Sequence, residues 1–173
     1  MTETDTPLLS VTTLFAEREE RRRREHEAEE QLQKKHQEDL EGFRKRLDEF
    51  QVTDDRVHAM AHRIKEAFDR GENELMLTSF PSSFCTDGGR AVNNADLPPI
   101  NKPAALPNPS LPPEPAWLAT LPRGIHAIYD HWKQHLRPGG FHFSVRVISY
   151  PGGKPGDVGV FLSWPKTAPD RPA

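Results

Sequence analysis

A chain of 173 residues with 35% hydrophobic residues is long enough for one small domain once its charged and proline-rich stretches are set aside. Its net charge of -3 gives no overall attraction to nucleic acid or anionic lipid, and its single cysteine excludes an intramolecular disulfide. The acidic N-terminus has too short an apolar run for a signal peptide, and no window has the apolar length of a membrane span. We therefore expect a cytoplasmic protein that contacts neither membrane nor nucleic acid.

Residues 1–52 predict a disordered N-terminus followed by a charged helical arm. About two residues in three between Glu17 and Arg46 are charged, and none is proline, which suits an exposed helix but not a core. Several acids stand four residues before a base, the order that stabilises a helix: Glu17/Arg21, Glu19/Arg23, Glu20/Arg24 and Glu30/Lys34. Such an arm supports itself and remains open to other proteins.

The end of the arm carries a short apolar stripe. Its members are spaced three, four and three residues apart: Leu40, Phe43, Leu47 and Phe50. This is the seam of a short coiled coil or of a helix docked in a groove, and it lasts only about two heptads. We expect these four residues to mediate oligomerisation or binding of a protein partner. The alternative is that they pack against their own domain.

Residues 53–164 predict a small α+β domain. Thr53 and two aspartates start a helix that ends at Gly71, and residues 74–80 are predicted to form a short strand that Pro81 stops. A second helix begins at Pro122, and strands follow at residues 141–150 and 158–164. The order αβ-αββ predicts two helices packed on one face of a three-stranded, mostly antiparallel sheet, the simplest arrangement that buries both helical stripes.

A proline-rich insertion interrupts this domain at residues 97–115. Its composition favours polyproline II or a disordered loop, and we interpret it as a connector rather than as a ligand for a partner. The tail at residues 165–173 is expected to be disordered.

The sequence FCTDGGRAVNN contains the residues of this chain that are best suited to catalysis or ligand binding. Cys85, in a glycine-containing loop that ends at Arg90, could be held as a thiolate by backbone N–H groups and act as a nucleophile. Alternatively, Gly88, Gly89 and Arg90 could bind an anion, or the segment could be a plain turn beside a small buried thiol. We expect no catalytic residue, with Cys85 and Arg90 as the alternative.

The CTDGGR spacing is similar to the six-residue loop of rhodanese-type sulfurtransferases, which implies thiol chemistry at Cys85 as the alternative activity. Rhodanese folds have a five-stranded parallel core, which the predicted elements of this chain do not provide. More broadly, FPSSFCTDGGRAVNN together with PGGKPGDVGVFLSW resembles a family of small uncharacterised bacterial proteins. That resemblance implies a bacterial source and brings no activity and no catalytic residue.

Two histidine pairs, His58/His62 and His131/His135, have the i, i+4 spacing of metal ligands on a helix. They lie on opposite flanks of the two helical stripes and lack the glutamate of a zinc protease motif, so we interpret them as surface histidines. We expect no metal and no cofactor. The sequence therefore favours a non-enzymatic protein-protein interaction or oligomerisation module, with a cysteine-dependent enzyme as the alternative.

Overall fold

A computed structural model describes residues 9–95 and 114–168 of the chain. The predicted disordered segment at residues 1–8, most of the proline-rich insertion and the end of the tail at 169–173 lie outside the described residues. Internal contacts divide the chain into an arm unit, residues 1–43, and a compact unit, residues 44–173. The compact unit therefore begins before residue 53, because it includes the last turn of the long helix.

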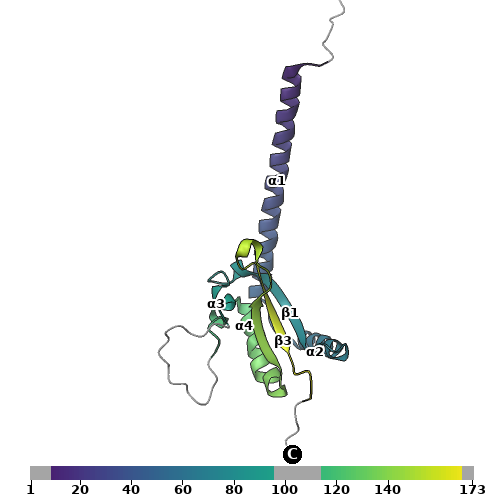
Figure 1. Cartoon of the computed structure of the whole chain (residues 1–173), viewed down its shortest axis with the longest axis vertical. Coiled ribbons are helices and arrows are strands. Elements are labelled where there is room, and N and C mark those ends of the chain that lie inside the picture. The colour runs from purple at the N-terminus through teal and green to yellow at the C-terminus, as the bar shows by residue number, and fades with distance from the viewer. Residues whose placement is uncertain (1–8, 96–113, 169–173) are drawn as a thin grey trace, which may run out of the picture. The chain divides into compact units, whose positions relative to one another are not determined.

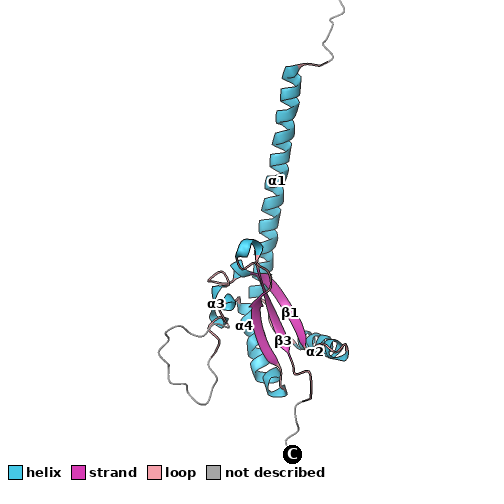
Figure 2. Cartoon of the chain, viewed as in Figure 1, coloured by secondary structure: helices cyan, strands magenta, loops and turns pink. Residues whose placement is uncertain are grey.

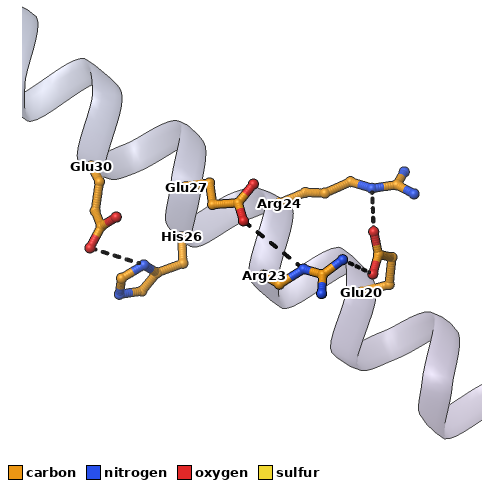
Figure 3. Close-up of polar contacts among 6 residues, drawn as sticks. All are labelled: Glu20, Arg23, Arg24, His26, Glu27 and Glu30. Carbon is orange, nitrogen blue, oxygen red and sulfur yellow. Dashed lines mark hydrogen bonds and ion pairs between the residues drawn. The ribbon is translucent and has the colours of Figure 1, made fainter.

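Helix α1, Val11–Asp48, runs for 38 residues (Figure 1). Figure 3 shows the ion pairs along its charged stretch, where Glu20 accepts hydrogen bonds from Arg23 at 2.5 Å and from Arg24 at 3.2 Å. The bond from Arg23 is the main reason why the pKa of Glu20 lies below its ordinary value. His26 and Glu30 pair at 3.5 Å further along. These contacts are exposed, so they support a helix that has little core to pack on.

The compact unit is built on a three-stranded antiparallel sheet, coloured magenta in Figure 2. Its strands are β1, Glu74–Pro81, β2, His142–Val147, and β3, Asp157–Ser163, in the order β1-β3-β2. The predicted α+β class and the antiparallel sheet are confirmed. The central strand β3 is buried along most of its length, because it has a neighbour on each side.

The core lies on one face of this sheet. Val158, Val160 and Leu162 alternate along β3 and are fully buried. Helix α4, Arg123–His131, covers this face with Ile125 and Tyr129, and its end continues as a π-helical turn at Trp132–Leu136. An aromatic cluster extends the core: Trp117, Tyr129, Trp132 and Phe143.

Helix α2, Asp54–Asp69, packs less fully than predicted, because Val57, Met60 and Ile64 of its apolar stripe are only half-buried. Across this helix, which is described in full, the buried residue is Ala67, while Phe68 is 61% exposed. Arg63 donates to the carbonyl of Met76 at 2.9 Å, so α2 lies near the β1 edge (Figure 2). Three strands span only about 10 Å, which is the diameter of one helix, so the face has room for α4 and leaves α2 only partly packed at its β1 side.

The last turn of α1 is packed into the compact unit through Gly124. A Cβ atom at this position would lie 1.9 Å from the carbonyl oxygen of Leu47, so only glycine permits the contact. Asp48 accepts a hydrogen bond from the N–H of Arg123 at 3.3 Å, which satisfies a donor in the first turn of α4. Leu47 itself is 7% exposed.

Candidate interaction surfaces

The predicted stripe at the end of the arm is divided between the two units. Leu40 and Phe43 belong to the arm unit and are half-buried. Leu47 is buried in the compact unit, and the half-buried Phe50 lies against Gly124 with the guanidinium of Arg56 4.4 Å from its ring centre. For Leu47 and Phe50 the structure thus has the packing that the alternative interpretation expects. Their role in binding another chain stays a prediction.

The start of the arm carries an exposed apolar surface that the sequence analysis passed over. We call it the arm tip: Leu9, Val11, Leu14 and Phe15. These side chains are between 43% and 71% exposed. In the sequence, this stretch stands out only as an apolar run that is too short for a signal peptide. The spacing of Val11, Leu14 and Phe15, at i, i+3 and i+4, is the pattern that would have identified one helical face.

A partly exposed apolar surface runs along α2, and we call it the α2 groove. It consists of two adjoining cavities of about 330 and 850 Å³ that share Val57, Met60 and Leu136. The larger cavity is lined from α2 on one side and from the residues around β2 and the end of β3 on the other. Its apolar lining residues include Val57, Met60, Ala61, Ile64, Phe68, Leu136, Phe141, Trp164, Pro165 and Ala168. The groove exists because the stripe of α2 is only partly covered: Val57 and Met60 face Leu77 of β1 and Leu162 of β3 across the smaller cavity.

The Cys85 loop has the geometry of a turn beside a buried thiol. Cys85 is buried, and burial together with the carboxylate of Asp87 raises its pKa to about 11. The thiol is therefore protonated at neutral pH, whereas a nucleophilic cysteine needs a thiolate. The side chain of Arg90 is exposed, and no charge contact between Arg90 and Cys85 contributes to the thiol pKa.

Two backbone donors at the end of this loop already have an acceptor. Asp87 accepts hydrogen bonds from the N–H of Gly89 at 3.0 Å and of Ala91 at 2.7 Å, at the start of the short helix α3, Arg90–Asn93. Gly88 and Gly89 both have positive φ, which favours glycine. A Cβ atom at Gly89 would also lie only 3.0 Å from the Cβ of Ser82. An internal carboxylate thus occupies the place that a bound anion would take.

The histidine pairs make local contacts. The ring of His58 bonds to the carbonyl of Asp54 at 2.7 Å, and His62 pairs with Glu66 at 3.5 Å. The rings of His131 and His135 lie 4.8 Å apart, and burial together with His135 lowers the pKa of His131. Within the described ranges, no group of three or more His, Cys, Asp or Glu side chains has a metal-binding arrangement.

Comparison with protein-family models, curated proteins and solved structures finds no match to this chain. Among the helices of the described residues, none combines the length and the apolar content needed to cross a membrane.

Proposed function

We propose that this protein is a non-enzymatic interaction module that associates with a second copy of itself, or with a protein partner, through its N-terminal helix. The observation that carries the proposal is the exposure of α1. Within this fully described helix, Leu47 is the buried residue, and the arm tip at the opposite end presents large apolar side chains to solvent.

An exposed patch of this kind favours association. Burial of one Leu, Val or Phe side chain contributes about 1.5 to 3 kcal/mol, so four such residues provide several kcal/mol before the entropic cost of binding is subtracted. Grouped apolar side chains on an otherwise polar surface are typical of protein-protein contacts. The charged middle of α1 supplies no comparable surface, because its apolar side chain Leu32 is isolated among polar residues.

The cysteine-dependent alternative has less support. A thiol with a pKa near 11 carries almost no thiolate at neutral pH, and the loop N–H groups bond to Asp87 instead. The proposal therefore rests on the arm and assigns no reaction to the protein.

The test is the double variant Leu14→Glu with Phe15→Glu, with Leu32→Glu as the matched control. Glutamate forms helices well and is favourable in the first turns, so the helix is expected to persist, as circular dichroism would verify. We expect light scattering to show an assembly for the wild type and the control, and a monomer for the double variant. If association depends on another protein, that complex should be lost with the double variant only. A wild-type monomer without a partner, or equal behaviour of both variants, would refute the proposal.

A further inference from the structure

We propose that the α2 groove is the receptor for the arm tip of a second copy of this chain. The inference rests on the proposed function and adds the surface on which the tip binds. It joins two exposed apolar surfaces of the chain that the fold itself leaves uncovered.

The groove has the shape and chemistry that receive an amphipathic helix. Its larger cavity, about 850 Å³, lies within the range of cavities that bind ligands, and its lining is mostly apolar. Helix-in-groove contacts use anchors at i, i+3 and i+4, which is the spacing of Val11, Leu14 and Phe15 on α1. Phe68, at the end of α2, is 61% exposed and is the largest apolar side chain that α2 gives to the groove.

The charges of the two surfaces are complementary. Cationic side chains line the groove: Arg56 and Arg63 at the smaller cavity and Lys166 at the larger. Among the described lining residues the acid is Asp69, which is neutralised by Lys65 at 2.9 Å. Near the tip the sequence has acids at Glu3, Asp5 and Glu17, while the first base, Arg18, lies over the ring of Phe15 at 4.8 Å. Complementary charge of this kind orients partners and speeds their encounter.

The length of α1 identifies the occupant as a second copy. At about 1.5 Å per residue, Val11 lies about 50 Å along the helix from Arg44, where the compact unit begins. A folded unit of this size is about 35 Å across, so for any orientation an intact straight helix keeps the tip out of its own groove. The contact is therefore between unlike surfaces of two chains.

Unlike surfaces allow a decisive mixing experiment. The groove variant is Phe68→Glu, and its matched control is Ile148→Glu, which places the same acid at an exposed apolar position outside the groove. We expect the groove variant and the Leu14→Glu/Phe15→Glu tip variant each to be monomeric in sedimentation velocity, while the control associates like the wild type. An equimolar mixture of the two variants should form a species of two chains, because one intact tip and one intact groove remain.

A further variant measures how much the charges contribute to association. Lys166→Glu should weaken association by about two- to fivefold at low salt and by less at high salt, since exposed charge pairs contribute modestly and are screened.

The outcomes separate this inference from the proposed function. If the tip variant is monomeric but Phe68→Glu still associates, the arm function stands and the groove is not its receptor. If both variants are monomeric and their mixture stays monomeric, an intact tip does not bind an intact groove, and the inference is wrong. If the wild type is monomeric at every concentration and captures no partner, both proposals fail. Loss of association in Ile148→Glu as well would show that Phe68 has no specific role and would also overturn the inference.

Discussion

Truncation of Leu47 tests whether the end of α1 belongs to the core of the compact unit. Leu47 is 7% exposed and lies where α1 meets the start of α4. In Leu47→Ala, three buried carbons are lost at about 0.8 kcal/mol each, or about 2.4 kcal/mol. Leu47 also lines the smaller cavity of the α2 groove, so the site cannot collapse around the missing atoms. We therefore expect a total loss of about 3 to 4 kcal/mol in the free energy of unfolding.

The matched control is Leu32→Ala, the same substitution on the same helix. Leu32 is 69% exposed, so the expected change is within about 0.5 kcal/mol. For a unit of about 100 residues, 3 to 4 kcal/mol is a large part of the total stability and would lower the melting temperature by more than about 10 °C.

The assay is urea unfolding followed by tryptophan fluorescence, since all three tryptophans lie in the compact unit. A lower midpoint with an unchanged slope would be the expected signature. An unchanged midpoint in Leu47→Ala, or an equal loss in Leu32→Ala, would refute the packing of the last turn of α1 and would return Leu47 to the role of an exposed contact residue.

Three further predictions concern the compact unit. Because the pKa of Cys85 is raised to about 11, iodoacetamide should modify the thiol of the native protein far more slowly at pH 8 than the thiol of the unfolded protein, and Arg90→Ala should not change that rate. The free energy of unfolding should fall as pH rises from about 9 to 11, because the thiol of the unfolded chain ionises first. Rapid alkylation of the native protein would contradict this prediction. The carboxylate of Glu74 accepts hydrogen bonds from Arg146 at 2.8 and 2.5 Å, which lower its pKa, so its stabilisation should be present above its unfolded pKa and lost as pH falls through the folded value. Glu74→Gln should flatten that acid dependence, and an unchanged profile in acid titration would count against the pair. Trp132 donates its indole N–H to the carbonyl of Phe141 at 2.9 Å. In urea unfolding, Trp132→Phe should lower the free energy of unfolding by about 1 kcal/mol and Trp132→Ala by about 3 kcal/mol or more. Equal losses in the two variants would argue against the hydrogen bond.

Local patterns were sufficient to predict the elements of the fold. The helix start at Thr53, the end at Gly71 and the strands at 74–80 and 158–164 were predicted from caps and from the turn residues that bound them, and the structure has elements at these places. Short-range signals also predicted that Asp87-Gly88-Gly89 could form a turn. The structure adds that the carboxylate of Asp87 fills the loop, a contact that depends on backbone geometry and not on spacing.

The candidate surfaces were less accessible to sequence reasoning. The stripe of α2 looks the same in the sequence as the stripe of α4, because periodicity reports that a face is apolar and not what covers it. Likewise, Leu47 and Leu40 follow one seam, and only the close approach at Gly124 assigns Leu47 to the compact unit.

The sequence by itself determined the α+β class, the charged helix and the approximate positions of the strands, because these depend on residues within a few positions of one another. Tertiary structure alone decided that α4 takes the sheet face, that α2 keeps Phe68 in solvent, and that Cys85 is a buried, protonated thiol. These outcomes depend on competition for a limited area of sheet and on the distance to charges remote in the chain. The spacing of residues along the chain determines neither of these two quantities.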